Sequence, residues 1–163
     1  MAHAPAATLD QGHTAAADIV SSREMTREIC WQRLGQAPLG RVALVRHGRP
    51  LIFPVNHVTD GHTVVFCTGA TSSLGSLAGR EPVAFEVDDG DPSMSRGWSV
   101  LVTGEIERLD RRTRPRIDPQ PEPWAPGKIE VWVRIVPMNV TGVEIFRRRR
   151  GAEHRILPNM APG

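Results

Sequence analysis

The feature of the chain that most constrains its fold is a strict alternation along residues 98–107. Every second position carries an apolar residue or glycine: Trp98, Val100, Val102, Gly104 and Ile106. The positions between them carry Ser99, Leu101, Thr103, Glu105 and Glu107. A period of two places the two sets on opposite faces of a β-strand. The stretch therefore predicts a strand with one continuous apolar face.

Shorter apolar runs, separated by turn residues, indicate further strands at residues 41–47, 51–58, 63–67, 82–89, 129–135 and 140–146. Tight turns are expected at 47–50 and at 59–62, which contains an Asp-Gly pair. Pro54 cannot donate a hydrogen bond to a neighbouring strand, so its position predicts a sheet edge or a bulge. Successive strands with tight turns favour an antiparallel sheet, and seven strands would remove their edges by closing into a barrel.

Two peripheral helices are expected beside these strands. The first begins at Ser21, which together with Glu24 has the spacing of a capping box, and it ends at Gly35. Its apolar face is expected to comprise Met25, Ile29, Cys30 and Leu34. The second helix spans residues 72–81 and is weakened by Gly75.

The limits of the folded domain follow from local composition. Residues 1–20 lack periodicity and predict a flexible N-terminal tail, and the arginine-rich residues 147–163 predict a flexible C-terminal tail. Residues 21–146 form the predicted domain. Within it, residues 110–127 are rich in proline and arginine and predict a long surface connection between two strands.

Composition argues against several classes of protein. The chain has 163 residues, of which 40% are hydrophobic and 23% charged, values typical of one globular domain. No apolar run is long enough to cross a membrane, and the first residues, MAHAPAATLDQGH, lack a secretory signal. Cys30 and Cys67 both lie in apolar patterns, so we expect two small core residues, without a disulfide framework, in a cytoplasmic protein. A net charge of +2 and few aromatic residues do not favour nucleic-acid binding, and the arginine run at 147–150 is interpreted as a solvated tail.

Residues 66–77 read FCTGATSSLGSL and change from an apolar strand to hydroxyl-bearing residues and glycine. We name residues 68–76 the serine-rich corner. At the start of a helix, such a corner offers N–H donors and hydroxyls to an anion. The same residues can also form a cap and turn that bind nothing, and both interpretations stay open at this point.

The histidines do not form a recognisable metal site. His47, His57 and His62 match no known ligand spacing, and no metal is expected. His57 is either a proton donor toward a substrate, because imidazole titrates near neutral pH, or a residue of the core. No catalytic triad is visible in the sequence, so the catalytic residues stay unknown.

Four segments, in this order, resemble the pyridoxamine 5'-phosphate oxidase-like, flavin-binding split-barrel family, in particular its small bacterial members. They are LGRVALVRHGRPLIFPVNHVTDG, VVFCTGATSSLGSLAGREPVAFEVDD, RGWSVLVTGEIERL and WVRIVPMNVTG. The resemblance covers roughly residues 26–146. It implies a mostly β fold, an antiparallel six- or seven-stranded split β-barrel with peripheral α-helices. It also implies a homodimer that holds FMN in the groove between its subunits.

The resemblance further implies a set of cofactor-binding residues. Those expected along the edge of the flavin ring are Phe53, Pro54, Val55 and Asn56. Those expected around the ribityl phosphate are Thr68, Ser72, Ser73 and Leu74. Trp98 and Ser99 are expected to reach the ring from the partner subunit. Independently of the family, Trp98 can be a core aromatic, and Asn56 can merely satisfy a backbone group.

The sequence departs from the family pattern in the serine-rich corner. Family members commonly have Gly-Thr-Lys-Leu or Ser-Arg-Lys where this chain has residues 71–74, Thr-Ser-Ser-Leu, so the corner lacks a cation. A neutral group binds phosphate more weakly than a charged one. The arginines that could compensate are Arg41, Arg49 and Arg80. Two further departures are His57, where the family often has tyrosine, and Gly142-Val143, where it often has Gly-Arg.

The function implied by this resemblance is hydride transfer to or from a small organic substrate, with FMN or the related deazaflavin coenzyme as cofactor. FAD and haem are alternative cofactors. The alternative function is a non-catalytic protein of the same fold that binds or stores a flavin or haem, and a third possibility is a barrel that has lost its ligand. Oxidation of pyridoxamine phosphate itself is not expected, because the resemblance is to the small relatives.

Overall fold

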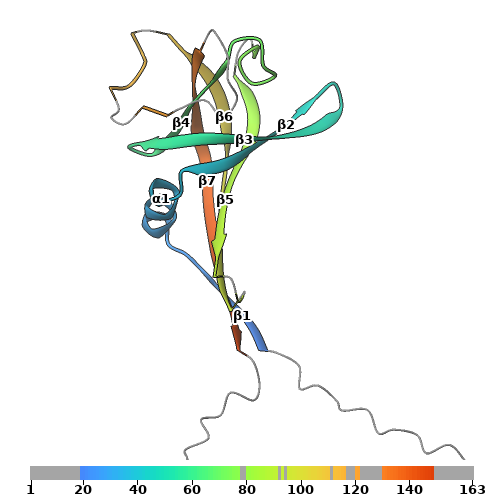
Figure 1. The fold of residues 1–163 in the computed structure, drawn as a ribbon, viewed down its shortest axis with the longest axis vertical. Coiled ribbons are helices and arrows are strands. Elements are labelled where there is room, and N and C mark those ends of the chain that lie inside the picture. Colours follow the sequence, from blue (N-terminus) through green and yellow to red (C-terminus); the bar gives the residue numbers. More distant parts are fainter. Residues whose placement is uncertain are drawn as a thin grey trace, which may run out of the picture.

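The computed structural model describes residues 19–77, 80–91, 93, 95–110, 112–116, 120, 121 and 130–148 (Figure 1). The elements in chain order are β1 (Ile19–Glu24), α1 (Arg27–Gln36), β2 (Leu39–Arg46), β3 (Arg49–Asp60), β4 (Thr63–Gly69), β5 (Glu81–Gly90), β6 (Arg96–Leu109) and β7 (Glu130–Arg148).

The strands form one antiparallel sheet that closes on itself. Its order is β1-β7-β4-β3-β2-β5-β6, and an additional pairing of β7 with β6 closes the ring. Strand β1 is attached to β7 outside this ring. The predicted split β-barrel is therefore confirmed, with six of the strands in the closed ring and β1 as the seventh.

The alternation that predicted strand β6 is confirmed by its burial. Val100, Val102, Gly104 and Ile106 are buried, whereas Leu101 and Thr103 between them are exposed. The buried set joins Phe66, Phe85 and other apolar residues from every strand of the ring in one core. The hydrophobic effect of burying these side chains is the main force that holds the ring together.

Strand β7 corrects the prediction of two separate strands at residues 129–135 and 140–146. It runs unbroken for 19 residues and passes through Pro137. Proline is tolerated there because the register against β6 shifts between Thr103 and Gly104, which makes Met138, next to Pro137, the extra residue of a bulge in β7. A Cβ atom on Gly104 would lie 2.2 Å from the carbonyl oxygen of Val136, so glycine permits this close approach. The strand continues to Arg148, two residues beyond the predicted end of the domain.

The start of the first helix also differs from the prediction. Residues 21–24 belong to strand β1, which begins at Ile19 and pairs with residues 143–148 of β7. The helix begins at Arg27, and Thr26 is its N-cap, with Oγ1 accepting a hydrogen bond from the Ile29 N–H at 3.4 Å. The capping-box pattern at Ser21 is overridden because these residues gain a complete ladder of backbone pairs along β7.

Helix α1 covers one side of the barrel through a face slightly different from the predicted one. Cys30 and Leu34 are buried as expected, and Trp31 is buried with them. Ile29 is 38% exposed and lies outside the core. Within the described residues, no helix is long and apolar enough to cross a membrane.

The predicted second helix is wrong in the part that the structure describes. Residues 70–76 form consecutive turns, with the Ser72 N–H bonded to the Gly69 carbonyl and the Ser76 N–H bonded to the Ser72 carbonyl. Short polar side chains and Gly75 favour turns over helix, because they bond the local backbone or leave it flexible. Residues 78 and 79 lie outside the described part.

The long connection at residues 110–127 is described only in part. Its arginine Arg114 lies 3.7 Å from the centroid of the Trp132 ring. Trp132 belongs to a second, smaller apolar cluster, with Val65, Cys67 and Leu109. The described part of the connection therefore contacts this second cluster.

Candidate cofactor site

The site begins where strands β3 and β4 separate. Strand β3 pairs with β2 along residues 49–56, but it pairs with β4 only from His57 onward. Beyond Phe66, strand β4 pairs with β7 and leaves β3. Residues 50–56 of β3 therefore have no strand partner on the β4 side, which confirms that Pro54 lies at a sheet edge.

A cavity of about 150 Å³ lies in this split, and we name it the β3 cavity. Its lining residues are Phe53, Pro54, Val55, Cys67, Thr68, Ser72 and Leu74. The structure thus brings together residues predicted for the ring edge and residues predicted for the phosphate. Asn56 and Ser73 do not line the cavity themselves, although each is adjacent in sequence to a lining residue. Cys67 was not predicted, because its apolar neighbours indicated a core position.

Hydrogen bonds inside the serine-rich corner fix its shape. The Ser72 hydroxyl lies 2.8 Å from Thr68 Oγ1 and accepts a bond of 2.9 Å from the Gly75 N–H. The Ser72 N–H donates to the Gly69 carbonyl at 3.0 Å. A Cβ atom on Gly75 would lie 2.1 Å from that same carbonyl oxygen. Ser72 therefore makes the central hydrogen bonds of the serine-rich corner. The close approach of residues 69 and 75 requires glycine at position 75.

A cation does reach the serine-rich corner, but from a residue that sequence reasoning missed. Arg46, at the end of β2, donates from Nη1 to the Ser73 carbonyl at 3.0 Å and to Ser76 Oγ at 3.0 Å. Two of the predicted candidates form ion pairs elsewhere, Arg41 with Glu86 and Asp88, and Arg80 with Glu105 and Glu107. The predicted turn at residues 47–50 places Arg46 at the end of a hairpin strand, and the sequence offers no other signal for its position.

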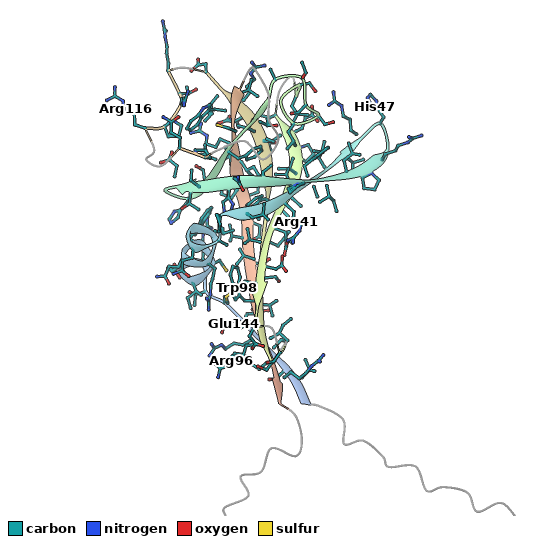
Figure 2. All side chains as sticks on the ribbon, in the orientation of Figure 1. Arg41, His47, Arg96, Trp98, Arg116 and Glu144 are labelled. Atoms are coloured by element: carbon teal, nitrogen blue, oxygen red, sulfur yellow. The ribbon has the colours of Figure 1, made fainter. Side chains whose placement is uncertain are left out.

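Trp98 and Ser99 lie away from the β3 cavity, on an extension that we name the stem: residues 87–90, 96–100, 142–148 and 19–24. Figure 2 shows Trp98 on the stem near helix α1, and His47 far from it at the tip of the β2–β3 hairpin. The guanidinium carbon of Arg33 lies 5.2 Å from the Trp98 ring centroid. Within one chain, neither Trp98 nor Ser99 is among the residues that line the β3 cavity.

The stem carries its own charged cleft of about 450 Å³, lined in part by Arg96, Trp98 and Phe146. Glu144, opposite Trp98 in the β6–β7 pairing, accepts hydrogen bonds from Arg23 and Arg33. The bond from Arg23 is the main reason that the pKa of Glu144 is lowered. These pairs hold α1 and β1 against β7.

His57 is a core residue. Its side chain is buried, its Nε2 lies 3.0 Å from the Leu34 carbonyl, and its ring meets Phe85 edge-on at 4.8 Å. A carbonyl can only accept, so Nε2 carries the proton. Desolvation by burial lowers the pKa of His57, which favours the neutral form. His57 does not line the β3 cavity, so it serves to attach the end of α1 to β3.

Comparisons with known proteins agree with this architecture. The family model described as pyridoxamine 5'-phosphate oxidase matches residues 26–144. The uncharacterized protein Rv0080 of Mycobacterium tuberculosis is 35% identical over 134 residues, which cover 78% of this chain and 88% of that protein. The solved FAD binding protein from Mycobacterium smegmatis is 30% identical, with a TM-score of 0.60, over 76% of this chain and 98% of the other. A candidate pyridoxamine 5'-phosphate oxidase from Corynebacterium glutamicum is 26% identical, with a TM-score of 0.61, over 77% of this chain and 94% of the other.

Proposed function

Because the chain belongs to the pyridoxamine 5'-phosphate oxidase family, we propose that it binds a flavin nucleotide at the β3 cavity and transfers hydride to or from a small organic substrate. The observation that carries this proposal is the open edge of β3 beside the serine-rich corner. The ring of a flavin has one polar edge and one apolar edge, and a strand edge supplies backbone groups to the first. A hydroxyl-rich turn with an arginine supplies partners for the phosphate.

FMN is the cofactor that we propose. Its single phosphate fits the single corner, whose residues Thr68, Ser72 and Leu74 line the β3 cavity. FAD is the second candidate, favoured by the likeness to the Mycobacterium smegmatis FAD binding protein. FAD shares the ring, the ribityl chain and the first phosphate with FMN, so the same contacts would hold that part. The deazaflavin coenzyme carries a ribityl phosphate as well, on a related ring in which carbon replaces nitrogen N5.

We further propose that the site is completed by a second copy of the chain. The β3 cavity measures about 150 Å³, whereas pockets that enclose a ligand usually measure roughly 300–1,000 Å³. One chain therefore supplies only part of the wall. Trp98 and Ser99, which lie on the stem, are the residues proposed to reach the ring from the partner.

The outer face of the β2–β3 hairpin offers a surface for that partner. Ala43 lies opposite Ile52, and Val45 lies opposite Pro50, so all four side chains share one face. Val45 and Ile52 are each 67% exposed. Contiguous exposed apolar side chains are typical of an interface between subunits.

The chemistry divides between cofactor and protein. When bound, the flavin supplies the hydride acceptor or donor. The residues of this chain orient the ring along β3, hold the phosphate at the corner and exclude water through apolar side chains such as Phe53 and Leu74. The polar side chains that line the cavity are the hydroxyls of Thr68 and Ser72 and the thiol of Cys67. None of these is an ordinary acid or base at neutral pH, so we assign no catalytic proton donor.

This lining also favours the second candidate function, a protein that binds or stores a flavin without turnover. Haem fits the described residues less well. His57 is the buried histidine among them, and its Nε2 is already bonded to the Leu34 carbonyl.

The visible spectrum of freshly purified protein, with mass identification of the bound molecule, tests the proposal. A flavin spectrum that bleaches with NADPH and recovers with an electron acceptor supports the oxidoreductase. A flavin that responds to neither supports the binding protein, and a colourless protein that takes up neither FMN nor FAD contradicts both. Light scattering on the same sample tests whether a second copy of the chain completes the site. A monomer with full flavin occupancy would contradict a site shared between two subunits.

A further inference from the structure

We propose that Arg46 is the side chain that binds the phosphate of the flavin nucleotide. This inference rests on the proposed function and names the charged residue of that site. Arg46 reaches the serine-rich corner from β2 and touches it at Ser73 and Ser76, whereas neighbouring residues Ser72 and Leu74 line the β3 cavity. The guanidinium thus contacts Ser73, which lies in sequence between two residues of the cavity wall.

The contacts of Arg46 leave its charge without a counter-charge. The half-buried arginines in the described part of the chain are Arg33, Arg46 and Arg134. Arg33 contacts the carboxylate of Glu144, and Arg134 contacts that of Glu107. Among the described residues, the polar contacts of Arg46 are a carbonyl and a hydroxyl, which are neutral acceptors. A charge removed from water is costly without an opposite charge, so this arrangement favours the arrival of an anion.

Arg49, the cross-strand neighbour of Arg46, strengthens the case for a bound anion. Arg46 lies directly opposite Arg49 in the β2–β3 pairing, so both side chains project from the same face of the hairpin. Like charges in this position repel each other. None of the ion pairs found among the described residues involves either of them. An anion between the hairpin and the corner would relieve this repulsion.

The geometry also leaves donors free for a ligand. Both hydrogen bonds that Arg46 makes to the serine-rich corner use Nη1, and a guanidinium carries five N–H donors in a planar fork. Such a fork can hold the corner with one nitrogen and a phosphate with another. Arg46 can therefore order the corner and bind the phosphate at the same time.

The test compares two ligands that differ only in the phosphate. Affinities of FMN and riboflavin are measured by titration calorimetry for the flavin-free wild-type protein and for Arg46→Gln, Arg46→Lys and Arg41→Gln. Arg41 is the matched control, because it lies on the same strand, carries the same charge and forms its ion pairs with Glu86 and Asp88.

We expect Arg46→Gln to weaken FMN binding by about 10- to 100-fold and to leave riboflavin binding within about twofold, as for the loss of one charge-assisted hydrogen bond. Arg41→Gln is expected to change FMN binding by less than about threefold. Where Arg46→Gln does not fold, Arg46→Lys decides: it keeps the charge but loses the fork, so FMN should weaken and riboflavin should not.

Equal losses of FMN and riboflavin in an Arg46 variant would overturn the inference, because Arg46 would then only shape the corner. Unchanged FMN binding, or an equal effect of Arg41→Gln, would overturn it as well. A wild-type protein that binds neither ligand would instead refute the proposed function, and this inference with it.

Discussion

Gly75 offers a direct test of how the serine-rich corner is built. A Cβ atom at this position would lie 2.1 Å from the Gly69 carbonyl oxygen and 3.0 Å from Ala70 Cα. Both are backbone atoms, so no side-chain rotation can relieve the clash. In Gly75→Ala the corner must open by more than 1 Å, because a comfortable contact between such atoms needs roughly 3.5 Å.

The cost follows from the bonds that this opening would break. The Ser72 N–H bond to Gly69 and the Gly75 N–H bond to the Ser72 hydroxyl are each worth about 0.5–1.5 kcal/mol. Overpacking adds about 1–3 kcal/mol of strain. We expect a loss of about 2–6 kcal/mol of unfolding free energy, which lowers Tm by roughly 4–24 °C in a chain of this size.

Gly69→Ala is the matched control, because a Cβ atom on Gly69 meets nothing within 4 Å. Both variants reduce the freedom of the unfolded chain equally, so that contribution cancels in the comparison. Calorimetry should show Gly69→Ala close to the wild-type Tm and Gly75→Ala well below it. Equal Tm values for the two variants would refute the close approach of Gly75 to Gly69.

Two further predictions concern His57 and the hairpin face. Burial lowers the pKa of His57 in the folded state, so the unfolded chain binds the proton more readily. The free energy of unfolding should therefore fall as the pH drops below about 6.5. This part of the decrease should disappear in His57→Gln. Urea unfolding at about pH 7.5 and about pH 5 measures it, and identical pH dependence in the two proteins would contradict it. Ile52→Lys places a charge on the exposed hairpin face and should shift light scattering from dimer to monomer and weaken flavin binding together. A fully dimeric variant would exclude that face as the interface.

The sequence predicted the strands better than the elements between them. Strict alternation along β6 reflects burial of one face, and the structure reproduces it from Val100 to Ile106, whereas Trp98 and Ser99 are both half-buried. The capping-box pattern at Ser21–Glu24 misled, because local spacing cannot reveal that β7 extends far enough to pair with these residues. The bulge in β7 beside Pro137 was missed for the same reason, since it depends on the register of a distant strand.

The sequence predicted most of the residues that line the candidate site, but it did not predict which charged residue lies beside them. Phe53, Pro54, Val55, Thr68, Ser72 and Leu74 do meet around one cavity. The three arginines named from sequence did not include Arg46, because its contact with Ser73 spans 27 positions and depends on the reach of a hairpin. The burial of His57 beneath α1 likewise depends on tertiary packing that no local pattern encodes.

The length of β7 has a consequence for biosynthesis. This one strand pairs with β1, β4 and β6, so three strand edges lack their neighbour until residues 130–148 leave the ribosome. The nascent chain cannot close its ring before then, and most contacts among the described residues join residues that are distant in sequence. Such topologies fold slowly, and their exposed strand edges are prone to mispairing. We therefore expect the ring to close only after β7 has been synthesised, with the edges of β1, β4 and β6 unpaired until that point.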